Sequence, residues 1–197
     1  LGNVTPLISV EGLERVSDER RGGRGVYASA MQAVAHCRAE RLVTGVATSV
    51  CRSNIDELVS TEFLDGLVAA GVHYAWYYIY RPCGANPCRE LALPDEDILR
   101  LRRFIVEQRA RSRLALVDAY WDAEGRALCP AVTGISHHIN PYGDVEVCPP
   151  IQFATDRIDE RTDVRELFDR STLLREFRRD VAARTRGCIL LEAPGEL

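Results

Sequence analysis

Lysine is absent from this sequence of 197 residues, because all 25 basic residues are arginines. The chain therefore contains no Schiff-base lysine, no Walker-type phosphate-binding lysine and no lysine general base. Long hydrophobic runs are also missing, since no apolar stretch approaches the roughly 20 residues that a membrane-spanning helix needs. A formal net charge of −4 gives no broad basic surface for nucleic acid. We expect neither nucleic acid nor a membrane as a partner.

The remaining composition, 46% hydrophobic and 27% charged, is typical of a soluble globular protein. Its seven cysteines are odd in number and scattered, whereas secreted disulfide scaffolds are smaller and usually have an even number. We therefore expect a cytoplasmic location with some metal-binding thiols. The chain begins at Leu1 without methionine and continues directly into a strand pattern, so we interpret the sequence as part of a longer protein.

The first part of the chain alternates between apolar β-branched runs and helical patterns. Strands are predicted over residues 4–10, 42–50, 72–80 and 114–120. Helices are predicted between them, beginning at Val26, after the N-cap Asn54 and at Pro94. This order implies an α/β fold with parallel strands and crossover helices. We assign residues 1–122 to this domain.

The pattern changes beyond residue 122. Residues 129–155 are typical of short strands with a turn at residues 141–144, and a helix is predicted near residues 171–184. We therefore expect a second domain over residues 123–197, consisting of a small β-hairpin and a helix.

Polar residues follow the predicted strands, and parallel sheets bind ligands at the carboxyl ends of their strands. The candidates at these ends are Ser9, Glu11, Thr48, Asn54, Tyr80, Arg81 and residues 118–121. Such side chains suit a polar cofactor with hydroxyl groups and a carboxylate. The structural alternative is that Asn54 only caps its helix and that Glu11 only ends its strand.

The segment SDERRGGRG, residues 17–25, raises the question of a phosphate-binding loop. It lacks the GxGxxG pattern, so this signal is weak. An arginine in this segment could instead bind a carboxylate through its planar fork. A solvated charged loop is the remaining alternative.

The segment CPAVTGISHHINPYGDVEVC, residues 129–148, places a histidine pair and a turn between two cysteines. The turn would bring Cys129 and Cys148 to the same end of a hairpin, and thiolates favour zinc or iron–sulfur clusters. Cys188 is the most credible third ligand. Adjacent strand residues point to opposite faces, so at most one of His137 and His138 could join these cysteines; packing or hydrogen bonding is the preferred interpretation of both.

Two further cysteines, Cys83 and Cys88, lie in the segment RPCGANPC. Their spacing is not a strong metal-binding pattern. They could be reactive or form a reversible disulfide, although a packing role is the preferred interpretation.

Together these motifs resemble the radical S-adenosylmethionine (radical SAM) superfamily, specifically members with a C-terminal SPASM or shortened twitch extension. The C-x(9–15)-G-x4-C opening of that extension is matched by Cys129, Gly143 and Cys148. The segment ISVEGLERVSDERRGGRGVY, residues 8–27, is similar to the family's fourth strand and following helix start. The segment GVATSVCRSNIDEL, residues 45–58, is similar to its fifth strand. The resemblance covers essentially the whole chain, but the family's CxxxCxxC loop is absent from this sequence.

The resemblance implies a partial (β/α) barrel of parallel strands followed by a hairpin-plus-helix extension. The chain would be the C-terminal part of such a protein, and by itself it would not cleave S-adenosylmethionine. The implied cofactors are S-adenosylmethionine and iron–sulfur clusters, which generate a radical that abstracts hydrogen from a substrate, while the protein orients the reactants. The implied partners are a peptide or small-molecule substrate and an electron donor such as a flavodoxin or ferredoxin.

The resemblance also implies roles for individual residues, although it assigns no catalytic residue. The implied S-adenosylmethionine-binding residues are Ser9, Glu11, Arg21, Thr48, Asn54, Tyr80 and Arg81. Ser9 and Glu11 would face the methionyl and ribose groups, and Arg21 (or Arg20) would lie near the carboxylate. Thr48 and Asn54 would lie on the same rim, with Tyr80 and Arg81 near the adenine. The implied ligands of one auxiliary [4Fe-4S] cluster are Cys129, Cys148 and Cys188.

Two alternatives to an enzyme stay open from the sequence. The first is a non-catalytic module in which the same three cysteines, with one histidine as an optional fourth ligand, hold structural zinc. The second is a degenerate scaffold that binds a partner across an open edge of its sheet.

Overall fold

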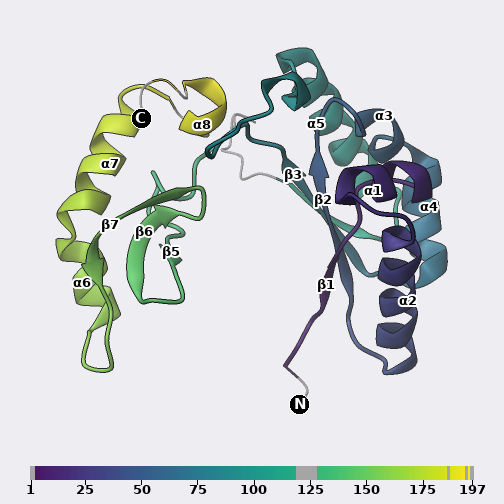
Figure 1. Ribbon diagram of the computed structural model, residues 1–197, viewed down its shortest axis with the longest axis horizontal. Helices are drawn as coiled ribbons and strands as arrows, with labels where there is room; N and C mark the ends of the chain where they lie inside the picture. Colours follow the sequence, from purple (N-terminus) through teal and green to yellow (C-terminus); the bar gives the residue numbers. More distant parts are fainter. Residues whose placement is uncertain (1–2, 119–127, 186, 194, 196–197) are drawn as a thin grey trace. The chain divides into compact units, whose positions relative to one another are not determined.

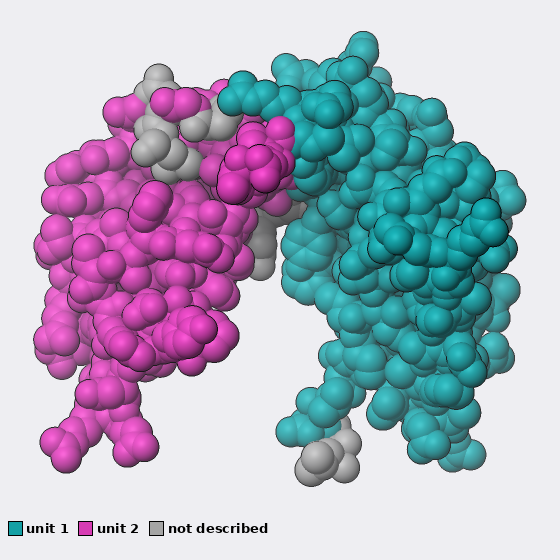
Figure 2. Space-filling view, in the orientation of Figure 1, with its two compact units in different colours: residues 1–80, 88–119 teal, residues 81–87, 120–197 magenta. Residues whose placement is uncertain are grey.

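The computed structural model describes residues 3–118, 128–185, 187–193 and 195. The chain divides into two units, shown in different colours in Figure 2: unit 1 is Leu1–Tyr80 with Cys88–Ala119, and unit 2 is Arg81–Pro87 with Tyr120–Leu197. The domain boundary expected near residue 122 lies outside the described residues. Among the helices of the described ranges, none combines the length and the apolar character that a membrane crossing requires.

Unit 1 contains a parallel sheet of four strands in the order β1-β2-β3-β4 (Figure 1). The strands are β1 (Leu7–Ser9), β2 (Gly45–Val50), β3 (Tyr74–Ile79) and β4 (Ala115–Val117). The helices are α1 (Glu14–Arg21), α2 (Val26–Ala39), α3 (Ile55–Leu58), α4 (Thr61–Ala70) and α5 (Asp95–Arg109), with a short 3₁₀ helix, η1 (Arg89–Leu91). The α/β class and the parallel strands predicted from the sequence are confirmed, whereas a barrel stays a prediction.

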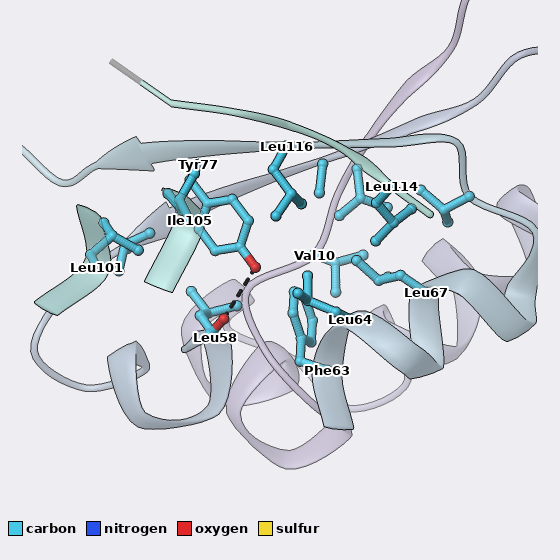
Figure 3. Close-up of a cluster of buried hydrophobic side chains, with 14 of the residues drawn as sticks. Val10, Leu58, Phe63, Leu64, Leu67, Tyr77, Leu101, Ile105, Leu114 and Leu116 are labelled. Atoms are coloured by element: carbon cyan, nitrogen blue, oxygen red, sulfur yellow. Dashed lines mark hydrogen bonds between the residues drawn. The ribbon is translucent and has the colours of Figure 1, made fainter. Parts of the chain in front are cut away.

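The core of unit 1 lies between one face of the sheet and its helices. A row of apolar residues at matching register crosses the four strands: Ile8, Val46, Ala75 and Leu116. Side chains alternate between faces along a strand, so Val50 and Tyr77 belong to the same buried face, which packs against helix residues such as Leu64 and Ile105. Figure 3 shows the Tyr77 hydroxyl, which donates a hydrogen bond to the Leu58 carbonyl at 3.1 Å and so satisfies the polar atom of this buried ring.

Two segments of unit 1 differ from the sequence prediction. Residues 17–21, expected in a loop, belong to α1, which ends at Gly22 in the left-handed conformation (φ 73°). The single helix expected after Asn54 is split into α3 and α4. The split occurs because the Ser60 hydroxyl accepts a hydrogen bond from the Phe63 N–H at 3.2 Å and starts a new helix.

Unit 2 contains a three-stranded antiparallel sheet in the order β5-β6-β7. Its elements are β5 (His138–Ile139), β6 (Asp144–Cys148), β7 (Ile151–Arg157), α6 (Val164–Arg170), α7 (Thr172–Ala182) and α8 (Ile189–Glu192). The predicted turn joins β5 to β6, and the helix predicted near residues 171–184 is α7, which the Ser171 hydroxyl caps. Helices α6 and α8 have no counterpart in the sequence prediction. Residues from β6, β7 and the three helices form a separate apolar core.

Candidate functional site

Polar groups at the carboxyl ends of β1 and β2, together with two residues of α1, form one hydrogen-bonded set, which we call the Glu11 network: Glu11, Ser17, Arg21, Ser49 and Asn54. Glu11 is buried, and one carboxylate oxygen, Oε1, accepts a hydrogen bond from Arg21 Nη2 at 2.7 Å. The other oxygen, Oε2, accepts from the backbone N–H of Ser49 at 2.8 Å. The Glu11 N–H donates to the Ser17 hydroxyl at 3.1 Å. The buried carboxylate is therefore fully bonded within unit 1.

Asn54 ties the ends of the two strands together. Its side-chain amide nitrogen donates to the carbonyls of Glu11 at 2.9 Å and Ser49 at 3.0 Å, while its oxygen accepts from the Cys51 N–H at 2.8 Å. The residue precedes α3, yet its side chain makes no capping hydrogen bond to that helix. The alternative that Asn54 only caps its helix is therefore wrong.

Arg21 is the partially exposed member of the Glu11 network. Its side chain is 38% exposed, and one guanidinium nitrogen, Nη2, donates to Glu11. Because a guanidinium carries five N–H donors, this geometry leaves donors for the carboxylate of a ligand. The neighbouring Arg20 lies outside the network, and its Nε is buried without a hydrogen-bond partner in the described part of the chain.

The glycine-rich segment after α1 binds a carboxylate of the chain itself. The Tyr27 N–H donates to Asp18 Oδ1 at 2.8 Å, and the Gly25 N–H donates to Asp18 Oδ2 at 2.7 Å. These bonds, that from Tyr27 first, lower the pKa of Asp18. Because backbone donors that a phosphate loop would offer are already used, the structure argues against the phosphate-loop interpretation and shows an arginine–carboxylate pair in the same segment.

Three further predicted residues lie outside the Glu11 network. Ser9 is exposed on β1, at the register of Ala47. Thr48 is 1% exposed, and its hydroxyl has no hydrogen-bond partner among the described residues. Strand alternation places it on the same buried face as Val50. Tyr80 continues the sheet through its backbone, since its N–H donates to the Val50 carbonyl at 2.8 Å.

Two other residues at predicted strand ends have partners of their own. Asp118 accepts hydrogen bonds from Arg102 Nη1 and Arg109 Nη2, each at 2.7 Å. The rest of the predicted segment, residues 119–121, lies outside the described residues. Arg81, expected near an adenine, belongs to unit 2, where its Nε donates to Cys188 Sγ at 3.0 Å.

Unit 2 brings its three candidate metal ligands into one neighbourhood, which we call the three-cysteine site: Cys129, Cys148 and Cys188. Burial raises the pKa of Cys148 to about 11, and the thiols of Cys188 and Cys129 contribute to the increase. A hydrogen bond from the Ile151 backbone and the charge of Arg81 act in the opposite direction. Cys148 is therefore within electrostatic range of both other thiols and of the guanidinium.

The three-cysteine site is not a ready-made coordination shell. In the ranges that the structure describes, no group of three or more His, Cys, Asp or Glu side chains has the geometry of a metal site. The donor chemistry nevertheless fits an iron–sulfur cluster or zinc, both of which thiolate sulfur favours.

Both histidines of the hairpin segment have protein partners. His137 Nε2 lies 2.6 Å from Arg178 Nη2, and burial, followed by the charge of this arginine, lowers the pKa of His137. His138 Nδ1 lies 2.7 Å from Glu146 Oε2, and this glutamate is buried. The expectation that the histidines pack or hydrogen-bond agrees with these contacts. The seven cysteines, all described, form no disulfide.

No protein-family model matches the sequence, and no curated protein matches it. Solved structures do match. The crystal structure of SuiB from Streptococcus suis aligns with a TM-score of 0.70 and 12% sequence identity, over 89% of this chain and 45% of SuiB. The chain has a SuiB-like fold. SuiB bound to S-adenosylmethionine aligns with a TM-score of 0.68 and 13% identity, over 88% of this chain and 44% of SuiB. The chain thus spans less than half the length of SuiB, and the likeness at this identity concerns the fold.

Proposed function

We propose that this chain is part of a radical SAM enzyme, in which unit 1 contributes to the binding of S-adenosylmethionine and unit 2 holds an auxiliary iron–sulfur cluster. The Glu11 network, at the carboxyl ends of parallel strands, is the observation that carries this proposal, because ligands of such sheets bind at these ends. The SuiB-like fold supports it, since one of the matching SuiB structures contains S-adenosylmethionine. The sequence motifs point to the same cofactor.

Within unit 1, we assign the contact with the cofactor carboxylate to Arg21. Both carboxylate oxygens of Glu11 are bonded within the chain, so its role is to orient the Arg21 guanidinium and the Ser49 N–H. A guanidinium held by an ion pair at one nitrogen can bind a carboxylate through its remaining donors with a smaller loss of conformational freedom. Asn54 supports this arrangement by fixing the backbone at Glu11 and Ser49.

Within unit 2, the three thiols supply soft donors for one cluster. When bound, such a cluster would accept or donate an electron during the reaction of a peptide or small-molecule substrate. The CxxxCxxC motif, absent from this sequence, would be supplied by another part of the protein. A flavodoxin or ferredoxin is the proposed electron donor. The chain itself contributes orientation and binding rather than cleavage of S-adenosylmethionine.

Anaerobic reconstitution of the full chain with iron and sulfide tests the metal-binding half of this proposal. We expect iron and sulfide in [4Fe-4S] stoichiometry by chemical analysis and Mössbauer spectroscopy. Cys148→Ser should lose most of the bound iron, whereas the matched control Cys83→Ser, at an exposed cysteine, should retain it. Zinc without iron in anaerobically purified protein would contradict the cluster and favour the structural-zinc alternative.

Saturation-transfer NMR with S-adenosylmethionine tests the other half, because it detects weak binding by a chain that lacks the first cluster. Methionyl and adenosyl protons should show transfer from the wild-type chain. Arg21→Gln should weaken binding about tenfold or more, the effect of losing a charged hydrogen bond. The control is Arg24→Gln, an exposed arginine of the same segment. Equal transfer from the two variants would contradict the assignment of Arg21.

A further inference from the structure

The three-cysteine site contains a cationic group that the sequence motifs assign elsewhere. Arg81 follows β3 in sequence, but it belongs to unit 2, and its Nε lies 3.0 Å from the Sγ of Cys188. The same guanidinium is within electrostatic range of Cys148, as are the thiols of Cys129 and Cys188. One arginine thus contacts one candidate ligand, Cys188, and acts electrostatically on a second, Cys148.

We propose that Arg81 is a positioning residue for the iron–sulfur cluster of unit 2: it donates a hydrogen bond to the Cys188 sulfur and offsets the negative charge of the three thiolates. This inference rests on the proposed function of unit 2. It replaces the expected role of Arg81 near an adenine with a role at the metal.

Charge balance gives the physical reason. Three thiolate ligands would outweigh the positive charge of an oxidised [4Fe-4S] core, so the liganded cluster would be anionic and a neighbouring cation would stabilise it. A guanidinium stays protonated at any working pH, so its charge is available whenever the thiolates form. Its planar Nε–H also has a fixed direction, which restricts the orientation of the Cys188 side chain before binding. Arg81 therefore favours both assembly of the site and the correct placement of one ligand.

The same contact predicts an effect on redox chemistry. Hydrogen bonds to cluster sulfurs and the net charge around a cluster set its reduction potential. Reduction adds an electron to an already anionic group, so a neighbouring cation stabilises the reduced state more than the oxidised state. Arg81 should therefore raise the reduction potential of the cluster, an effect that a purely structural hydrogen bond elsewhere in unit 2 would not have.

The test uses the full chain, reconstituted anaerobically, with the variants Arg81→Met and Arg81→Lys. The control is Arg161→Met, at an exposed arginine of unit 2. Two quantities are measured: iron affinity by competition with a chelator, and the midpoint potential by EPR-monitored redox titration. Arg81→Met should lower the midpoint potential and weaken iron affinity roughly 10- to 100-fold, the usual effect of losing a group that orients a ligand. Arg81→Lys, which keeps the charge, should have an intermediate midpoint potential.

The outcomes separate this inference from the proposed function. If wild-type protein binds the cluster and both variants match it in potential and affinity, the role of Arg81 is wrong and the proposed function stands. Binding of zinc alone, without iron, would remove the cluster and with it the redox role of Arg81. Arg81→Lys keeps the test decisive should Arg81→Met fail to fold, which circular dichroism would show.

Discussion

The Glu11 network and the three-cysteine site differ in how completely their polar groups are bonded. In the network, both oxygens of Glu11 and both polar atoms of the Asn54 side chain have partners within hydrogen-bond distance. In the three-cysteine site, burial raises the pKa of Cys148, the thiols of Cys188 and Cys129 add to the increase, and the charge of Arg81 opposes it. The first site keeps its geometry without a ligand, whereas under the proposed function the second would be stabilised by binding one.

The origin of this difference lies in the local backbone. The network uses the N–H and carbonyl groups that parallel strands expose at their carboxyl ends, and these groups are held by the sheet itself. In the three-cysteine site, Cys129 precedes a turn and Cys188 precedes the four-residue helix α8, so that only Cys148 lies on a strand. The sheet positions the first site, whereas two of the three candidate ligands of the second lie outside regular strands and helices.

Replacing Asn54 in the Glu11 network is expected to have the largest effect on the stability of the chain. Asn54→Ala leaves the Cys51 N–H and the carbonyls of Glu11 and Ser49 without partners in a buried place. Since an unsatisfied buried polar group costs about 1–3 kcal/mol, we expect the free energy of unfolding to fall by about 3 kcal/mol or more. Urea denaturation followed by circular dichroism measures this change. The exposed neighbour Arg52→Ala should change it little, and a similar loss in both variants would contradict the role of Asn54.

The sequence predicts some residues of the Glu11 network and misses others. The strand pattern placed Glu11 and Asn54 correctly at one edge, because parallel strands bring their carboxyl ends together. It did not predict Ser49, which contributes through its backbone N–H, nor Ser17, whose hydroxyl accepts a hydrogen bond from the Glu11 N–H. The burial of Thr48 could have been predicted from the sequence, because alternation along β2 places this residue with the buried residues rather than at the rim.

For the three-cysteine site, the sequence predicted the cysteines but not the arginine beside them. The motif indicated Cys129 and Cys148, and Cys188 was the most credible third candidate; unit 2 brings the three thiols within electrostatic range of one another at Cys148. Arg81 could not be identified, because its contact with Cys188 joins residues 107 positions apart in sequence. No local pattern encodes such a contact, which depends on how Arg81 and the residues after α7 fold into the same unit.

The reactivity of the Cys148 thiol tests the environment of the three-cysteine site. In the metal-free folded chain, burial raises the pKa of Cys148 from 9.0 to about 11. Near neutral pH, its thiolate fraction should therefore be about 100-fold smaller than that of an ordinary thiol. We expect iodoacetamide to modify Cys148 about 100-fold more slowly in the folded chain than in the urea-unfolded chain, as measured by peptide mass spectrometry. Equal rates in the two states would contradict this environment.

Replacing Gly12, which follows Glu11, is expected to have a smaller effect on stability, and replacement of a second glycine serves as the control. Gly12 has a φ of 148°, and an added Cβ would lie 2.7 Å from Glu57 Oε2, which accepts a hydrogen bond from the Leu13 N–H. Gly12→Ala should therefore lower the free energy of unfolding by roughly 2 kcal/mol through backbone strain and displacement of Glu57. The control Gly66→Ala, in α4 with open space around it, should instead stabilise the chain by up to about 1 kcal/mol. Equal melting temperatures for the two variants would contradict this reasoning.

The smallest expected effect concerns Asp18, which joins α1 to the start of α2. Hydrogen bonds from the Tyr27 and Gly25 N–H groups lower its pKa below the ordinary value of 3.8. A lowered pKa in the folded state means that its stabilising contribution is present above pH 3.8 and is lost as the pH falls through the folded-state pKa. Asp18→Asn should therefore lower the melting temperature at neutral pH and reduce its dependence on pH below 3.8, where the exposed control Asp65→Asn should behave like the wild type. An unchanged acid dependence in Asp18→Asn would mean that these backbone bonds do not hold the carboxylate, and the first turn of α2 would then need another source of stabilisation.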